Sequence, residues 1–323
     1  MPLRPAADPS APRPALGGRG RTAVPPDHTR LLAARRLAEA LPDLLVEASR
    51  VAAAVAAGWH GRRRAGSGET FWQYRPYDPG ESAARIDWRR SARDDEPRVR
   101  EREWQAAHTV WLAPDLSPSM DWGSPLARVT KRDRAVVLAL ALADLLGRAG
   151  ERVGMPGLVT PRSERRAAER LAEALARTSE GPALPEAVAL GPYCDVVVIG
   201  DFLDPLDQIE RRLAALAAEG ARLHLLRVVD PAEPDPPWTG NVEFRDPETG
   251  EIFHGARAEA VRDDWRRVWA ARGEALEALA RPRRWTLLAH RTDRSPAEAL
   301  LALHVALGGP RHGLGREPRG AGA

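Results

Sequence analysis

Short apolar runs alternate with helical segments from about residue 105 to residue 308. The runs are HTVWLAPD, GERVGM, DVVVIGD, RLHLLRVVD and RRWTLLAH, and helical periodicity lies at about 131–147, 162–177, 206–219, 259–279 and 296–307. Continuous Val, Ile and Leu runs indicate strands that are buried on both faces. Their alternation with helices predicts an α/β fold with a doubly wound, mainly parallel, Rossmann-like sheet.

One segment of this region departs from the alternation. VEFRDPETGEIFHG contains two short strand patterns around a turn signal that runs from Asp246 to Gly250. Proline, aspartate and glycine between two such patterns are typical of a hairpin. We therefore expect a two-stranded hairpin in addition to the sheet.

The chain before residue 105 has a different character. Leucine and alanine recur at helical spacing from about residue 27 to residue 58, and Pro42 is expected to interrupt them. Residues 61–104 combine arginine, glycine and aromatic residues, which favours loops and short strands. We predict disordered tails at 1–26 and 309–323, an N-terminal region of helices and Arg/aromatic-rich sequence at 27–104, and the α/β domain at 105–308.

Charge and cysteine content exclude several classes of protein. The chain carries 48 Lys and Arg against 45 Asp and Glu, so a uniformly polycationic binder of nucleic acid or membrane is not expected. A single cysteine, Cys194, cannot form an intrachain disulfide or a thiolate metal site, and it is expected to be buried and inert. The longest apolar run, residues 135–146, is too short to span a bilayer. These features favour a cytoplasmic protein that does not itself cross the membrane.

The first predicted strand of the sheet ends in an Asp-x-Ser-x-Ser sequence. Asp115, Ser117 and Ser119 stand at alternate positions between this strand and the following helix. Loops after the strands of an open α/β sheet are where ligands bind. One carboxylate and two hydroxyls on the same side of such a loop suit a hard cation, Mg²⁺ or Mn²⁺.

A second carboxylate is expected at the same edge. Asp201 is the last residue of DVVVIGD, so the two strand ends would bring Asp201 near the Asp-x-Ser-x-Ser loop. An alternative interpretation is that Asp115 and Ser117 only cap the following helix and accept hydrogen bonds from its free N–H groups. The sequence leaves both interpretations open.

Several segments together resemble a known family. They are RRRAGSGETFWQYRPYDPGESAARIDWRRSAR, VREREWQAAHTVWLAPDLSPSM, VVVIGDFLDP, VVDPAEPDPPWTGNVEFRDPETG and HRTD, within about residues 58 to 305. In these segments the chain resembles the domain of unknown function 58 family, whose body is similar to the von Willebrand factor A fold. The stretch YRPYDPGESAARIDWRRSAR is the most specific part of this resemblance.

The resemblance implies a set of ligands and a kind of activity. The metal-ion-dependent adhesion site of von Willebrand A domains maps onto Asp115, Ser117, Ser119 and Asp201. Its usual threonine is not matched, because no glycine pair precedes Thr178, the nearest candidate, and Thr160 fits no better. Members of the family are often encoded beside MoxR-type AAA ATPases and membrane proteins with von Willebrand A domains. The implied function is that of a non-catalytic adaptor or assembly factor acting with such partners.

Other interpretations of the sequence remain open. A metal-dependent phosphoesterase could use the same carboxylates, but it would need a general base or a second metal. The Arg/aromatic segment could bind single-stranded nucleic acid, although its many carboxylates balance the charge. It could also dock a protein partner through Arg85, Asp87 and Trp88. Alternatively, its aromatic side chains could pack over one edge of the sheet: Trp72, Tyr74, Tyr77 and Trp88.

Overall fold

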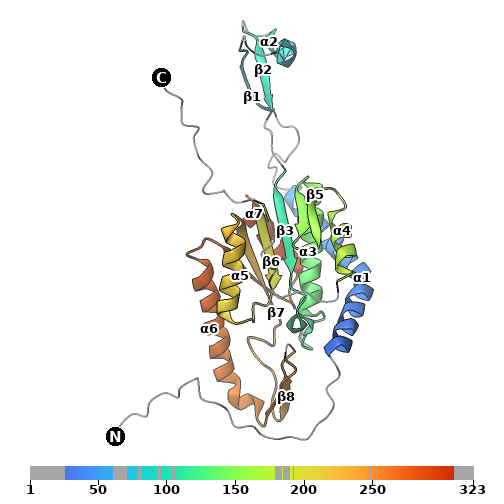
Figure 1. Cartoon of the computed structure of the whole chain (residues 1–323), viewed down its shortest axis with the longest axis vertical. Helices are drawn as coiled ribbons and strands as arrows, with labels where there is room; N and C mark the ends of the chain where they lie inside the picture. The colour runs from blue at the N-terminus through green and yellow to red at the C-terminus, as the bar shows by residue number, and fades with distance from the viewer. Residues whose placement is uncertain are drawn as a thin grey trace, which may run out of the picture.

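The computed structural model (Figure 1) describes most of the chain. The described residues are 26–60, 71–78, 80, 82–92, 96–102, 107–178, 184, 190–191, 193–247 and 249–308. The predicted tails lie outside them, apart from Pro26, with which the first helix begins. Of the predicted Arg/aromatic stretch at 61–104, residues 61–70, 79, 81, 93–95 and 103–104 also lie outside the described residues.

The centre of the molecule is a six-stranded sheet. Its strands are β3 (Thr109–Pro114), β4 (Arg152–Met155), β5 (Val159–Ser163), β6 (Asp195–Gly200), β7 (Arg222–Val229) and β10 (Thr286–Arg291). They are arranged in the order β10-β7-β6-β3-β4-β5, and all neighbours are parallel except β5, which is antiparallel to β4. This is the order of a doubly wound sheet with its topological switch between β3 and β6. It confirms the predicted α/β fold, with the antiparallel strand at the edge.

Helices cover both faces of this sheet (Figure 1). They are α1 (Pro26–His60), α3 (Lys131–Arg148), α4 (Ala167–Leu175), α5 (Leu206–Ala218), α6 (Arg262–Ala280) and α7 (Pro296–Leu307). One apolar core lies between the sheet and α1, α3, α4 and α7, and a second lies between the sheet and α5 and α6. Neighbouring valines of β6 point to opposite cores, which is why its sequence is a continuous apolar run: Val197 faces the first core and Val198 the second.

The long first helix corrects one expectation. Helix α1 is continuous through Pro42, where an interruption was predicted. Pro42 lies on the exposed side of the helix, so the carbonyl that loses its partner can bind water. Leu41 and Leu44 on the other side are buried in the same core as α3, and this packing holds the helix together.

The edge strand β5 corrects a second expectation. A helix was predicted from about residue 162, but Arg162 and Ser163 belong to β5, and α4 begins only at Ala167. A turn at 156–158 reverses the chain after β4, so the next residues pair back onto that strand. An edge strand tolerates Pro161 because one side of its backbone is unpaired. The turn residues Pro156 and Gly157 were the available signal.

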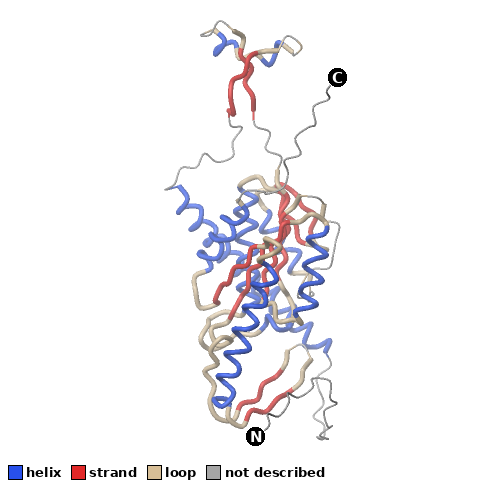
Figure 2. Tube along the Cα trace, turned by 90° about the vertical axis from the view of Figure 1, so that its left-hand side faces the viewer, coloured by secondary structure: helices blue, strands red, loops and turns tan. Residues whose placement is uncertain are grey.

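Two strand pairs lie outside the main sheet (Figure 2). The pair β1 (Phe71–Pro76) and β2 (Arg98–Arg102) is antiparallel, and between its strands lie the 3-10 turn Ala83–Arg85 and the short helix α2 (Trp88–Ser91). The pair β8 (Val242–Arg245) and β9 (Ile252–Gly255) forms the predicted hairpin. Further 3-10 turns span Pro118–Asp121 and Ala258–Val261. Within the described part of the chain, no helix has the length and apolarity needed to cross a membrane.

Candidate cation and docking site

The two predicted carboxylates flank the switch point of the sheet. Asp115 directly follows β3 and Asp201 directly follows β6, the neighbouring parallel strand. The Asp115 backbone N–H donates to the Ile199 carbonyl at 2.8 Å, which extends the pairing to the strand ends. Both side chains are buried, at 2 % exposure each. The fold therefore places these residues where open α/β sheets bind ligands.

The loop after β3 is organised by its own polar side chains. The Asp115 Oδ1 atom accepts a hydrogen bond from the Ser117 N–H at 2.8 Å, and the Ser117 and Ser119 hydroxyl oxygens lie 3.1 Å apart. Ser117 precedes the turn Pro118–Asp121 without capping it through its side chain, and Thr130 caps α3 instead. The capping alternative is therefore wrong for Ser117, whereas Asp115 does stabilise a local turn.

Glycine is required at the end of β6. A Cβ atom at Gly200 would lie 2.9 Å from both the Cβ and the Oδ2 atoms of Asp115, closer than such atoms approach. The absence of a side chain at this position lets the Asp115 carboxyl group lie directly against the neighbouring backbone. The strand sequence DVVVIGD thus supplies both a carboxylate and the space that the other carboxylate occupies.

Arg132 fixes the backbone of the Asp-x-Ser-x-Ser loop. Its Nη2 atom donates to the carbonyls of Leu116 at 2.8 Å and Ser117 at 3.0 Å, and its Nη1 atom lies 2.8 Å from Asp121. The Arg132 side chain is itself buried. Met120 anchors the same loop in the apolar core. The loop is therefore held from both sides before any ligand binds.

Among the described residues, no basic side chain pairs with the Asp115 carboxyl group. Burial raises the pKa of Asp115 to about 8, and the nearby Asp201 adds to this effect, while hydrogen bonds from Ser117 offset only part of it. A buried carboxyl group in this situation favours the neutral form until a positive charge arrives. The position is thus electrostatically suited to a cation.

Asp201 has its own cation, which the sequence analysis did not assign to the site. Lys131, the first residue of α3, is 1 % exposed, and its Nζ atom donates to Asp201 Oδ2 at 2.8 Å and to Glu233 Oε1 at 2.7 Å. Burial opposes its charge, but the two carboxylates raise the pKa of Lys131 above its usual value. Lys131 is the sole lysine among 48 basic residues, a signal that composition alone had offered.

Glu233 connects the site to the segment after β7. Its Oε2 atom accepts a hydrogen bond from the Asp230 N–H at 2.8 Å. The fully buried Asp230 accepts in turn from the Ser124 hydroxyl at 2.6 Å and the Ser124 N–H at 2.9 Å. A continuous polar network therefore links Lys131 to the loops at 122–130 and 230–239, and the sequence analysis did not foresee its members.

The loop after β6 is also fixed, in an unusual conformation. Phe202 adopts a positive φ of 54°, which is rare for an aromatic residue. Arg272 of α6 donates to the Phe202 carbonyl from Nε at 3.1 Å and from Nη2 at 2.6 Å, and it also contacts the Asp204 carbonyl. An arginine from a distant helix thus holds the loop that presents Asp201.

Comparison with known proteins identifies the family of the chain. Residues 73–275 match the family described as "Protein of unknown function DUF58". The chain belongs to this family. Uncharacterized proteins of Mycobacterium bovis and Mycobacterium tuberculosis are 32 % identical to it over 246 residues, which cover 71 % of this chain and 76 % of theirs. The predicted membership of the DUF58 family is confirmed.

Two solved structures of Bacteroides proteins also resemble the chain. One is an aerotolerance-related membrane protein of Bacteroides fragilis, with a TM-score of 0.40 and 18 % identity. The other is a conserved hypothetical protein, BatB, of Bacteroides thetaiotaomicron, with a TM-score of 0.37 and 17 % identity. Each match covers 62 % of this DUF58 chain and 99 % of the other.

The two threonine candidates do not join the carboxylates in this DUF58 protein. Thr178 donates its hydroxyl to the Ala174 carbonyl at 3.0 Å, where it closes the last turn of α4. Thr160 is exposed on β5, which β4 separates from β3. Neither residue is in contact with the Asp-x-Ser-x-Ser loop, so a cation here would use the four predicted residues without a fifth protein ligand from these positions.

The predicted docking residues lie in the β1–β2 unit. Arg85 ends the turn Ala83–Arg85, although its side chain falls outside the described residues. Asp87 donates its N–H to the Arg98 carbonyl at 2.8 Å, and Trp88 begins α2. Trp88 is 64 % exposed, so for this residue the expected packing over a sheet edge is wrong. An exposed tryptophan is available for contact with a partner.

The opposite end of β6 carries a second buried aspartate. Asp195 lies 2.6 Å from Arg222 Nε, 2.9 Å from Arg222 Nη2 and 3.4 Å from the ring nitrogens of both His108 and His224. Burial alone would raise its pKa, but hydrogen bonds from His224 and Arg222 hold the pKa of Asp195 at about 2. The neighbouring Cys194 is buried as expected, and burial raises the pKa of its thiol to about 11.

The four predicted ligands fit a hard divalent cation by their chemistry. Two hydroxyls and two carboxylates meet at one edge, and one of the carboxyl groups has no positive partner. Among the described residues, no group of three or more His, Cys, Asp or Glu side chains could hold a metal. The donor set therefore suits Mg²⁺ or Mn²⁺ and lacks the soft or imidazole ligands that zinc prefers.

Proposed function

We propose that this DUF58 protein is a non-catalytic adaptor that docks a partner protein at the carboxyl edge of its sheet. The observation that carries the proposal is the Asp115 carboxyl group, which is buried beside two hydroxyls at the switch point without a compensating charge. Such a site gains most from a ligand that brings positive charge. Mg²⁺ or Mn²⁺ is the cation that the donors suit.

Each residue has a distinct part in this proposal. Ser117 and Ser119 would supply neutral oxygens to the ion, and Asp115 and Asp201 would balance its charge. When bound, the ion would offer an open coordination position to a carboxylate of the partner. Arg132 keeps the loop in place, and Lys131 keeps Asp201 in place, so the site needs little rearrangement on binding.

The partner that the resemblance implies is a MoxR-type AAA ATPase, acting with membrane-anchored von Willebrand A proteins in the cytoplasm. We propose that the adaptor presents a client to this ATPase for assembly or remodelling. The single cysteine, which is buried, is consistent with a reducing compartment. The exposed Trp88 offers a second contact surface on the β1–β2 unit.

Capture of the neighbouring ATPase by the purified adaptor tests the proposal. We expect capture in Mg²⁺ that is lost on addition of EDTA and lost in the Asp115→Ala variant. The matched control is Asp207→Ala, which removes an exposed carboxylate of α5. Capture that survives both EDTA and Asp115→Ala but fails in variants of Arg85, Asp87 or Trp88 would contradict the cation and assign docking to the β1–β2 unit.

A further inference from the structure

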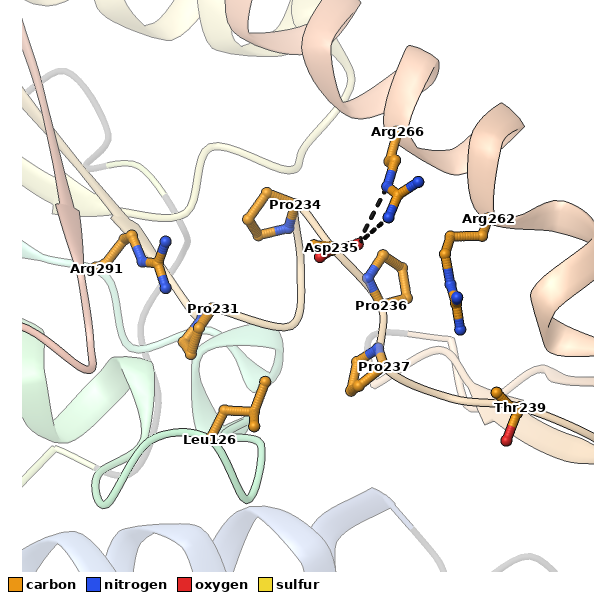
Figure 3. Close-up of a pocket in the computed structure, with 10 residues that line it drawn as sticks. All are labelled: Leu126, Pro231, Pro234, Asp235, Pro236, Pro237, Thr239, Arg262, Arg266 and Arg291. Atoms are coloured by element: carbon orange, nitrogen blue, oxygen red, sulfur yellow. Dashed lines mark hydrogen bonds and ion pairs between the residues drawn. The ribbon is translucent and has the colours of Figure 1, made fainter.

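A groove of about 600 Å³ lies beside the candidate site (Figure 3). One wall is the segment after β7, which includes Pro231, Pro234, Pro236 and Pro237. Proline has no backbone N–H, so these positions present carbonyls and apolar rings but no hydrogen-bond donors. The donors of the groove must come from the opposite sides.

Three arginines supply those donors. Arg262 and Arg266 belong to the start of α6, and Arg291 ends β10 on the other side of the proline segment (Figure 3). Within the lining they face a single carboxylate, that of Asp235, while two carboxylates outside the lining also pair with them: Asp263 with Arg266 at 3.1 Å and Asp293 with Arg291 at 2.9 Å. Guanidinium groups, with the Thr239 hydroxyl as the one other side-chain donor of the lining, favour a ligand that carries carboxylates or other anionic acceptors.

The groove already holds one carboxylate of the chain itself. Arg266 donates to Asp235 Oδ1 from Nε at 3.1 Å and from Nη2 at 2.6 Å. Both side chains are about half exposed or more, so this pair contributes little to stability and can exchange its partner. Asp235 thus shows that Arg266 can bind a carboxylate. Arg262 is bound to a neutral acceptor, the Trp238 carbonyl at 2.9 Å.

Apolar side chains adjoin the charged ones. Leu126 is 53 % exposed in the groove lining, and Trp265 is 44 % exposed on α6 between the two arginines in sequence. The Trp265 Nε1 atom donates to the Glu233 carbonyl, which fixes the indole ring against the proline segment. A ligand that combines acidic and apolar side chains would match this surface better than a small inorganic anion.

The groove and the candidate cation site share a rigid border. Glu233 binds Lys131 in the site, and the next residues, Pro234 and Asp235, line the groove. Similarly, Ser124 binds Asp230 of the polar network, and Leu126, two residues further along the chain, lines the groove. The same two loops therefore carry both the polar network of the site and part of the groove lining.

We infer that this groove binds an extended acidic segment of the partner protein, with glutamate or aspartate side chains on the arginines and apolar side chains against the prolines. The inference rests on the proposed docking function, since it names the chemistry of the segment that flanks the ion-binding carboxylate. A free oxyanion or a nucleic acid would use the same charges but not the apolar wall.

Fluorescence anisotropy with two labelled, end-capped peptides tests the inference on the full chain in EDTA. One peptide alternates glutamate and leucine, and in the matched peptide glutamine replaces every glutamate. We expect the glutamate peptide to bind at least about tenfold more tightly, with an affinity that falls as salt is added. Arg266→Gln and Arg262→Gln should each weaken binding about fivefold or more, and Asp235→Asn should strengthen it about twofold.

Two controls separate the groove from the cation site. Arg267→Gln removes an exposed arginine of α6 that does not line the groove, and it should leave binding unchanged. Asp115→Asn should also leave binding in EDTA unchanged, so a failure of the proposed cation would not affect this assay. Equal binding of the two peptides, absence of binding, or tighter binding of a single-stranded oligonucleotide would overturn the inference.

Discussion

The two edges of the central sheet treat a buried aspartate in opposite ways. At the amino edge, Asp195 is in contact with Arg222, His108 and His224, and hydrogen bonds from His224 and Arg222 hold its pKa at about 2. At the carboxyl edge, Asp115 is also buried, but the charge with the largest effect on it is that of another aspartate, Asp201, and burial together with this charge raises the pKa of Asp115 to about 8. Burial is common to both, so the difference lies in the partners that the fold supplies.

This difference separates a structural charge from one that is prepared for a ligand. A carboxylate that several basic side chains bind at once, as they do Asp195, stabilises the fold and has little capacity left for another cation. A buried carboxyl group without a partner is a cost to stability, and such costs are concentrated at functional sites. Substitutions at the two edges should therefore differ in their effect on the free energy of unfolding.

Replacing Lys131 should have the largest effect. Lys131→Met leaves Asp201 and Glu233 buried without their cation, and we expect the free energy of unfolding to fall by about 3–5 kcal/mol. Urea denaturation measures this change. The control Arg211→Met breaks an exposed pair with Asp207 on α5 and should change stability by less than about 1 kcal/mol. Equal losses of stability in the two variants would contradict the view that the Lys131 ion pairs stabilise the fold more than an exposed pair does.

Asp195→Asn should have a smaller but clear effect. The substitution keeps the shape of the side chain but removes the charge that Arg222 pairs with. Because Arg222 is partly exposed and can gain water, we expect a loss of about 2–3 kcal/mol in urea denaturation at neutral pH. A neutral outcome would contradict the view that the amino edge holds a structural charge.

Acid should weaken the fold through His290. Burial and the nearby Arg134 lower the pKa of His290 to about 4, below its unfolded value of about 6.5. The unfolded chain therefore binds more protons in this window, so stability is complete above about pH 6.5 and falls as the pH drops toward 4. We expect this residue to contribute a loss of about 2 kcal/mol between pH 7 and pH 4.5.

The His290 contribution can be isolated by substitution. Urea denaturation at a series of pH values should show a flatter profile for His290→Gln than for the wild-type chain. His254 is exposed on β9, and His254→Gln should keep the wild-type profile. If His290→Gln follows the same curve as the wild type, the acid sensitivity has another origin.

Asp115→Asn should have the smallest effect on stability. The amide retains the shape and the acceptor for the Ser117 N–H, and the carboxyl group that it replaces has no cationic partner among the described residues. Because the amide has no charge to desolvate, we expect the free energy of unfolding to rise, or to fall by less than about 1 kcal/mol. A loss as large as that of Asp195→Asn would remove the contrast between the two edges.

The sequence predicted the main sheet and the four candidate ligands because both follow from local patterns. Continuous apolar runs reveal buried strands, and residues that follow parallel strands must meet at one edge. The role of Lys131 could not be predicted, because its partners Asp201 and Glu233 are 70 and 102 residues away and only the fold brings them together. The antiparallel β5 and the unbroken α1 were missed because neighbouring packing outweighed the local signals of a helical pattern and of Pro42.

Isothermal titration of Mn²⁺ into the purified chain tests most directly whether Asp115 belongs to a cation-binding site. The account predicts saturable binding to one site in the wild-type chain, loss of this binding in Asp115→Asn, and unchanged binding in Asp207→Asn. Absence of Mn²⁺ and Mg²⁺ binding to a folded wild-type chain, or equal binding by Asp115→Asn, would contradict the claim.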